Sequence, residues 1–149
     1  ARGRGAMTSP RELVARFYRD VWERADESAA REILRPDLSF RGSLGPVMRG
    51  VDAFVGYMRS IHAALADYTC IIEDLVATED RAAARMIFKG LHRGPFLGVA
   101  PTGREIRWAG AAFFRVEGTQ IAEIWVLGDL DSVKKQLSSV GKTKSNTCS

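Results

Sequence analysis

The first third of the chain repeats its large apolar residues with a helical period. Two neighbouring series recur every four positions, Leu13-Phe17-Val21 and Val14-Tyr18-Trp22. This spacing gives an α-helix a wide apolar stripe that must pack on something. Ser9-Pro10-Arg11-Glu12 combines a capping box with proline at the first helical position, so we expect the helix to begin there.

Two further helices are predicted before residue 66. A short one covers residues 28–34 and should stop before Pro36, because the residue preceding a proline avoids the helical conformation. The next runs from about Val51 to Leu65 and carries Phe54 and Met58 on one side.

After Asp67 the period changes to that of strands. Four segments rich in β-branched, aromatic or alanine residues are separated by short turns: residues 68–78, 81–91, 105–117 and 120–128. We therefore expect an α+β domain, with three N-terminal helices packed on one face of a strongly curved antiparallel or mixed sheet that leaves a conical pocket. The strands are apolar at both parities, so a homodimer should cover the outer face.

The length of 149 residues fits one domain over residues 9–137. Residues 1–8 are expected to be a flexible tail or a non-native extension, and residues 138–149 a disordered tail. The sequence contains neither an apolar run of membrane-spanning length nor the apolar part of a signal peptide, so we expect a cytoplasmic protein without a membrane partner.

The net charge of +4 does not indicate nucleic-acid binding. Six of the 22 basic residues lie in the terminal segments, which leaves more acidic than basic residues elsewhere. A basic stripe on one folded face is therefore not expected. His62 and His92 are thirty residues apart and have no acidic or cysteine residues at metal-binding spacing, so neither a metal nor a cofactor is predicted.

The last third of the chain contains the most specific motifs. They are, in chain order, Gly90-Leu-His92-Arg-Gly94-Pro-Phe96-Leu-Gly98-Val-Ala-Pro101-Thr102-Gly103, Glu123-Ile-Trp125-Val-Leu-Gly-Asp129 and Gln136-Leu137. This order closely resembles the SnoaL-like polyketide cyclases (ester cyclases), a branch of the nuclear transport factor 2-like superfamily. The resemblance implies helices that close one end of a bent sheet, a ligand inside the cone and a dimer through the outer sheet face. It also implies a cofactor-free intramolecular aldol ring closure, a lyase or isomerase type of chemistry, on a planar hydrophobic polyketide-like substrate.

Asp129 is the first candidate for the catalytic acid or base. It ends a strand that is apolar apart from Glu123, and a carboxylate that loses hydration there has a raised pKa and can carry protons near neutral pH. The resemblance assigns the same acid/base role to Asp129. The alternative is that Asp129 caps a helix over residues 132–137, because aspartate is a favoured N-cap.

Glu123 and Trp125 share strand parity with Asp129, so an undistorted strand would turn all three toward a cavity wall. For Glu123 we favour the alternative of an exposed residue or an ion pair with Arg107 or Arg115. Trp125 could fill the core and stack on a planar ligand.

His92 could orient a substrate carbonyl or enol, a pocket role that the resemblance supports, or it could bind backbone groups and hold the glycine turn. Both roles remain open. A donor for the enolate oxygen is needed as well, and His92, Trp108 or Tyr18 could provide it. The residues expected to contact the substrate are Trp125, Trp108, Tyr18, Trp22, Phe54, Met58, Phe96, Arg107 and Glu123.

Two other classes of function compete with the cyclase. One is an epoxide hydrolase or a ketosteroid-isomerase-like enzyme on the same fold, in which two carboxylates and an arginine would surround a water molecule. The other is a non-enzymatic domain that binds small molecules. An enzyme should hold Asp129 inside the cone, whereas a binding domain can place it on a helix cap that faces solvent.

Overall fold

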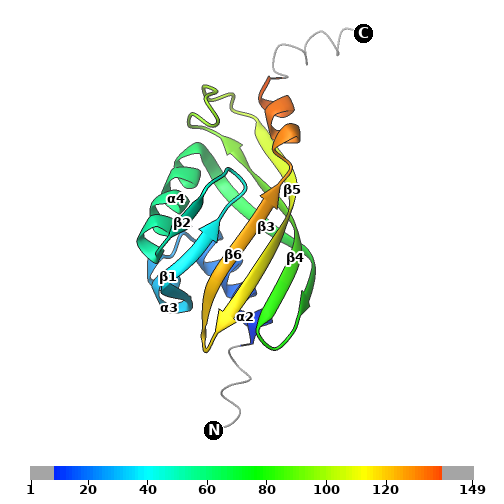
Figure 1. The fold of residues 1–149 in the computed structure, drawn as a ribbon. Helices are drawn as coiled ribbons and strands as arrows, with labels where there is room; N and C mark the ends of the chain where they lie inside the picture. Colours follow the sequence, from blue (N-terminus) through cyan, green and yellow to red (C-terminus); the bar gives the residue numbers. More distant parts are fainter. Residues whose placement is uncertain (1–8, 139–149) are drawn as a thin grey trace.

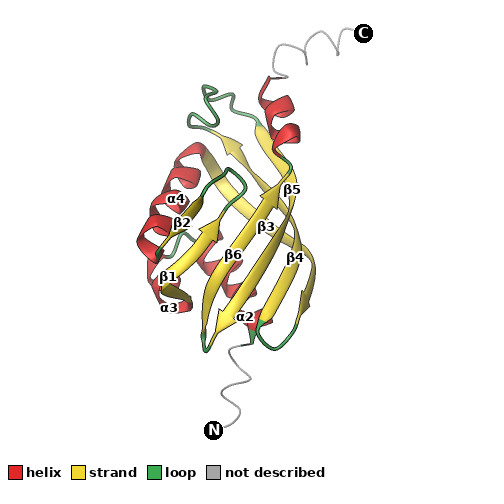
Figure 2. Ribbon diagram, viewed as in Figure 1, coloured by secondary structure: helices red, strands yellow, loops and turns green. Residues whose placement is uncertain are grey.

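The helices of the computed structural model cover one face of a six-stranded sheet (Figures 1 and 2). The structure describes residues 9–138. In Figure 1 the N-terminal helix lies behind β6 and β5, and α4 lies beside β1 and β2. In chain order the elements are α2 (Pro10–Arg16), η1 (Phe17–Glu23), α3 (Glu27–Ile33), β1 (Leu34–Arg41), β2 (Val47–Arg49), α4 (Val51–Ala64), β3 (Leu65–Ala77), β4 (Arg81–His92), β5 (Glu105–Glu117), β6 (Gln120–Gly128) and a last helical segment over residues 130–138.

The first helix begins where the capping pattern predicts. Ser9 Oγ accepts a hydrogen bond from the backbone N–H of Glu12 at 3.3 Å, and Pro10 is the first helical residue. From Phe17 onward, however, the segment continues as a π-helix rather than an α-helix. This wider turn keeps both apolar series buried, and it is a rare geometry that often occurs at functional sites. The helical period alone did not distinguish the two geometries.

The strand order of the sheet is β2-β1-β6-β5-β4-β3. Only β1 and β6 pair in parallel; the other neighbouring pairs among the described strands are antiparallel. The expected α+β fold with helices on one face of a mixed sheet is confirmed. The four expected strands are present, and β5 and β6 have the predicted bounds.

Strands β1 and β2 were not expected from the sequence. Pro36 removes a backbone donor and Asp37 favours turns, so β1 does not have a strand pattern. The structure accommodates Pro36 at an irregularity in the β1–β6 register between Leu34 and Ser39, which is where sheets tolerate proline. The preceding helix, α3, is capped by Asp26 and ends at Ile33, one residue earlier than predicted.

The core lies between the helices and the inner face of the sheet. Phe54 of α4 is fully buried, with its ring centroid 5.5 Å from that of Phe17 and 4.9 Å from that of Phe40. Along β4, β5 and β6 buried residues alternate with exposed ones, so each strand has an inner and an outer face. Within residues 9–138 no helix is both long and apolar enough to cross a membrane.

Candidate functional site

An aromatic cavity lies between the helices and the inner face of the sheet. Seven aromatic side chains from six elements line it: Tyr18, Trp22, Phe40, Tyr57, Tyr68, Phe88 and Trp108. It offers about 20 Å³ of space for water, enough for about one molecule. Ligand pockets usually measure roughly 300–1,000 Å³, so the cavity is too small for a drug-sized ligand in this conformation.

The segment between β1 and β2, residues 42–46, closes one side of this cavity. Gly42, Ser43 and Leu44 are part of its lining. A Cβ atom at Gly42 would lie 2.7 Å from the Tyr57 hydroxyl, and one at Gly128 would lie 2.4 Å from Ser43 Oγ. Because both positions are glycine, the segment can lie directly on the cavity.

The lining of the cavity contains hydroxyls and an indole N–H but no ionisable side chain that is charged near neutral pH, among the described residues. Burial raises the pKa of the Tyr18 and Tyr68 phenols well above their usual value, and raises that of Tyr57 to about 12. All three phenols therefore stay protonated. Burial likewise raises the pKa of the Cys70 thiol, although a hydrogen bond from Tyr68 acts in the opposite direction.

Most of these polar groups already have partners. Trp108 Nε1 donates to Ser43 Oγ at 3.4 Å, and the Tyr57 hydroxyl interacts with the backbone of Leu44. Within residues 9–138 the Tyr18 hydroxyl has no hydrogen-bond partner, although it is completely shielded from solvent.

His92 holds the glycine turn. Its Nδ1 accepts a hydrogen bond from the backbone N–H of Thr102 at 3.2 Å and lies 3.0 Å from Thr102 Oγ1. Its backbone N–H donates to the carbonyl oxygen of Arg104, and its carbonyl oxygen accepts from the N–H of Gly103, across the same turn. The ring is fully buried but is not part of the cavity lining. Of the two roles considered for His92, these contacts match the one that holds the turn.

The glycines of the same motif allow close packing. A Cβ at Gly94 would lie 2.3 Å from the carbonyl oxygen of Ala63, and a Cβ at Gly90 would lie 2.8 Å from Leu65 Cβ. The turn therefore presses against the junction of α4 and β3. Phe96, which is also buried, has its ring 6.3 Å from that of Trp108, behind the cavity wall.

Asp129 lies outside the aromatic cavity, and the expectation that water would hardly reach it is wrong. The residue is exposed, and its Oδ1 accepts a hydrogen bond from the backbone N–H of Ser132 at 3.1 Å. It therefore caps the helical segment 130–138. The side chain of Gln136 fastens that segment to β5 through hydrogen bonds to the backbone N–H and C=O of Arg107, at 2.9 and 2.6 Å. Leu137 is buried beside it.

Glu123 and Trp125 do share a face of β6, as the strand period predicts, but that face is the outer one, and Asp129 follows the end of the strand. Glu123 accepts a hydrogen bond from Arg115 Nε at 3.3 Å, which matches the favoured alternative of an ion pair. Trp125 is 40% exposed and is therefore not a core residue. Its ring lies under the guanidinium of Arg41, 5.0 Å from the ring centroid. Arg107 is also exposed.

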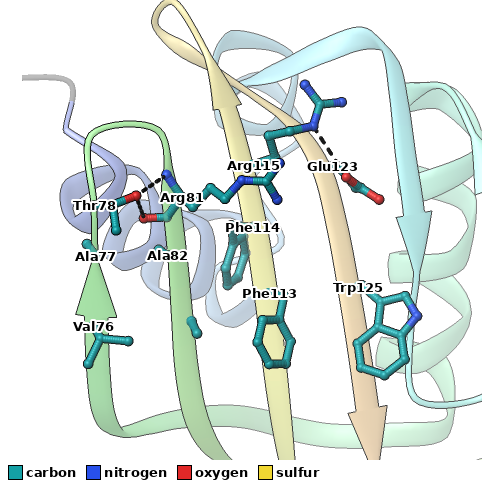
Figure 3. Close-up of a pocket in the computed structure, with 11 residues that line it drawn as sticks. Val76, Ala77, Thr78, Arg81, Ala82, Phe113, Phe114, Arg115, Glu123 and Trp125 are labelled. Atoms are coloured by element: carbon teal, nitrogen blue, oxygen red, sulfur yellow. Dashed lines mark hydrogen bonds and ion pairs between the residues drawn. The ribbon is translucent and has the colours of Figure 1, made fainter.

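An open groove of about 290 Å³ lies on this outer face (Figure 3). Its apolar floor includes Val76 of β3, Phe113 of β5 and Trp125 of β6, with exposed fractions of 62%, 51% and 40%. Figure 3 shows the Arg115–Glu123 pair on the same face. Asp129 is not part of the groove lining, so the groove does not contain the two carboxylates and arginine of the hydrolase alternative.

Of the residues expected to contact a substrate, Tyr18, Trp22 and Trp108 line the inner cavity. Phe54 and Met58 face the sheet, as predicted, but are fully buried in the core beside the cavity. Sequence reasoning missed Phe40, Tyr57, Tyr68, Phe88 and Ser43. Tyr57 lies on the α4 helix, three residues after Phe54, which was a signal that it could reach the same region. Nothing local in the sequence indicated that Ser43 would reach Trp108.

The comparisons with known proteins agree on one family. The family model of the SnoaL-like polyketide cyclase matches residues 12–137. No protein of curated function matches the chain. Among solved structures, TsrD from Streptomyces laurentii is 27% identical over 87% of this chain and 95% of that chain, with a TM-score of 0.76. IdmH from Streptomyces antibioticus, a candidate polyketide cyclase, is 26% identical over 86% and 97%, also with a TM-score of 0.76.

A structure from Jannaschia sp. CCS1, a candidate SnoaL-like polyketide cyclase, is 20% identical over 87% of this chain and 92% of that chain. Its TM-score of 0.80 shows the same fold. Because the family model covers nearly the whole described region and the element order agrees with it, this chain belongs to the SnoaL-like polyketide cyclase family.

Proposed function

We propose that this protein closes a ring in a flat, polyketide-like substrate by an intramolecular aldol reaction inside the aromatic cavity. The observation that carries the proposal is the cavity itself, an uncharged space with seven aromatic side chains in a member of the polyketide cyclase family. Aromatic walls bind planar apolar molecules and can fold a flexible chain so that its reacting carbons meet.

The small volume of the cavity implies that substrate entry requires movement. A planar molecule of several rings does not fit into about 20 Å³, so part of the wall must open. Residues 42–46 are the wall segment that belongs to neither a helix nor a strand. We place the entrance there. Closure of this segment over a bound substrate would exclude water and protect the enolate from being quenched.

Asp129 is the base in this proposal. Its backbone directly follows Gly128, whose Cβ position would lie 2.4 Å from Ser43 Oγ and 2.9 Å from Trp108 Nε1 at the rim of the cavity. Because the carboxylate caps a helix outside the cavity, it must leave the cap and turn inward to reach a bound substrate. The carboxylate takes a proton from a carbon next to a carbonyl, and the electron pair of that C–H bond forms the enolate. The enolate carbon then bonds to a second carbonyl carbon, and the resulting alkoxide takes the proton back from Asp129.

The pair of variants Asp129→Asn and Asp129→Ala separates this role from the observed helix cap. Asparagine caps about as well as aspartate but cannot accept the proton, so ring closure should fall by about two to four orders of magnitude at unchanged stability. Alanine lacks the cap and should also lose about 1 kcal/mol of unfolding free energy. The assays are turnover of a linear poly-β-ketone ester, followed by mass spectrometry after aromatisation, and urea unfolding. Full turnover by the folded Asp129→Asn variant would refute the role of Asp129 as base.

A ligand-binding domain without catalysis is the second candidate, and the exposed capping position of Asp129 favours it. Such a domain would bind flat aromatic compounds in the same cavity. Trp22 and Trp108 in the lining should report binding as a saturable change in fluorescence. Equal affinity in the wild type and in Asp129→Asn, together with no turnover in either, would establish this second function.

We also propose that two copies of the chain pair through the outer face of the sheet. The face exposes large apolar residues on three strands, which a monomer would leave in water: Ile71 and Val76 of β3, Phe113 of β5, and Trp125 and Leu127 of β6, with Ile87 of β4 half-buried between them. Contiguous apolar patches of this kind are typical of interfaces. Because a twofold axis brings the same patch of each copy together, the apolar residues would cover one another.

A further inference from the structure

The Tyr18 hydroxyl is a buried polar group to which the protein itself gives no partner. Tyr18 lies on the π-helical segment η1, is 3% exposed and lines the aromatic cavity. Its hydroxyl has no hydrogen-bond partner within residues 9–138. Buried tyrosine hydroxyls nearly always find a partner, because an unmet donor in an apolar site is costly. A hydroxyl of this kind beside a cavity is available to an acceptor that enters the cavity, either a water molecule or a ligand that displaces it.

We infer that the Tyr18 hydroxyl donates a hydrogen bond to the carbonyl oxygen of a flat ligand in the aromatic cavity. The inference rests on the proposed function, because it names the donor that holds the reacting oxygen. During ring closure the electron pair released from the C–H bond moves onto this oxygen, so the same hydrogen bond strengthens as the enolate forms. Tyr18 keeps its proton throughout and forms no covalent bond.

The other two donors considered for this role are already engaged or lie elsewhere. Trp108 Nε1 donates to Ser43 Oγ, and His92 belongs to the glycine turn and does not line the cavity. Of the remaining cavity phenols, the Tyr57 oxygen accepts from the backbone of Leu44, and the Tyr68 hydroxyl donates to the Cys70 thiol. Among the described residues, Tyr18 alone combines a place in the lining with a fully buried hydroxyl that has no hydrogen-bond partner.

The surroundings of Tyr18 determine what kind of acceptor it would take. Its ring lies 5.0, 6.4 and 6.0 Å from those of Phe17, Phe88 and Phe114, measured between centroids. A hydrogen bond in such an apolar site is stronger than in water. Because burial holds the pKa of Tyr18 well above its usual value, the phenol remains a donor across the physiological pH range. The matching ligand is an apolar ring system with one carbonyl oxygen at its edge, rather than a sugar or a nucleotide.

Fluorenone and fluorene provide a direct test, since these planar tricyclic molecules differ by one carbonyl oxygen. The wild type should bind fluorenone about tenfold more tightly than fluorene, the factor expected for one net hydrogen bond. In Tyr18→Phe this preference should disappear while the affinity for fluorene stays the same. Tyr57→Phe is the matched control: it removes a hydroxyl from the same cavity that already interacts with Leu44, and it should keep the preference.

The infrared carbonyl band of bound fluorenone tests the same bond independently of affinity. It should shift to lower frequency in the wild type and in Tyr57→Phe, and return to its position in an apolar solvent in Tyr18→Phe. The Phe variant should unfold at a urea concentration equal to or above that of the wild type, because it loses an unsatisfied hydroxyl. If Tyr18→Phe does not fold, the carbonyl band of fluorenone bound to the wild type still tests the inference. An unshifted band overturns it.

The outcomes distinguish this inference from the proposed function. A preference for fluorenone that persists in Tyr18→Phe overturns the role of Tyr18 but leaves the cavity as the binding site. Failure of the wild type to bind either compound overturns both. Ring closure with the same kcat in Tyr18→Phe as in the wild type overturns only the role of Tyr18, whereas the Asp129 variants test the base separately.

Discussion

Replacing Gly94 by alanine should show how strongly the glycine turn depends on close packing. The added Cβ would lie 2.3 Å from the carbonyl oxygen of Ala63 and 3.2 Å from Ala64 Cα. Ordinary contacts at a Cβ begin at 3.4 Å, so the two backbones would have to separate by about 1 Å. The obstacle is the backbone at the end of α4, which cannot swing aside as a flexible side chain could.

The cost of Gly94→Ala can be estimated from the contacts that would be strained. Overpacking costs about 1–3 kcal/mol. The shift also disturbs the hydrogen bonds from the N–H groups of Arg93 and Gly94 to the carbonyl oxygen of Ala64, at 3.0 and 3.1 Å, each worth roughly 0.5–1.5 kcal/mol. Against this, alanine reduces the entropy of the unfolded chain by an equivalent of about 0.4–1 kcal/mol. We expect a net loss of about 2–3 kcal/mol, which lowers Tm by roughly 4–12 °C for a chain of this size.

Gly56→Ala is the matched control. Gly56 lies on the exposed face of α4, and a Cβ there would meet nothing within 4 Å. Alanine should therefore stabilise the helix by about 0.5–1 kcal/mol. Urea unfolding followed by tryptophan fluorescence measures both variants, and calorimetry gives Tm. A Gly94→Ala protein as stable as the wild type, or a Gly56→Ala protein that is equally destabilised, would contradict the packing argument.

Two further predictions concern the outer face and the acidic limit of stability. Trp125→Glu would place a charge in the proposed apolar interface, so sedimentation velocity at micromolar concentration should change from a dimer to a monomer; a wild type that is only monomeric refutes the pairing. A hydrogen bond from Arg19 is the main factor that holds the pKa of Asp20 below its usual value of 3.8, and Arg24 contributes. Stability from this carboxylate is therefore present above about pH 4 and lost as the pH falls through the native pKa. Urea midpoints of Asp20→Asn should consequently depend less on pH below 4 than those of the wild type.

Local patterns in the sequence predicted those elements whose cause is local. The start of α2 depends on Ser9, Pro10 and Glu12 alone, and its capping bond is present. Strand β1 has a different cause. Its Pro36 and Asp37 oppose strand formation, and the strand exists because β6 pairs with it in parallel from more than eighty residues away. The exposed strand β2 spans three residues and pairs only with β1. Such pairing depends on tertiary contacts, which the local period of apolar residues does not reveal.

The same distinction between local and tertiary causes applies to the candidate site. The period of β6 correctly puts Glu123 and Trp125 on one face, but both faces of that strand carry apolar residues. Parity therefore could not decide which face the helices cover. That choice is made by packing of α2 and α3 on the sheet, which turns Ile124 and Val126 inward and leaves Trp125 exposed. The assignment of Asp129 to a shielded site failed for this reason.

The motif residues that identify the family mainly build the frame of this protein, and the cavity lining comes from other positions. His92 and Gly94 shape a turn, Asp129 caps a helix, and Gln136 fastens that helix to β5. The aromatic residues of the cavity, by contrast, come from η1, α4 and four strands, at positions outside the motifs: Tyr18, Trp22, Phe40, Tyr57, Tyr68, Phe88 and Trp108. Membership in the family therefore specifies how the cavity is framed but not which substrate fills it. Substrate choice should follow from the lining, and within that lining the unsatisfied Tyr18 hydroxyl is the group that a ligand oxygen would complete.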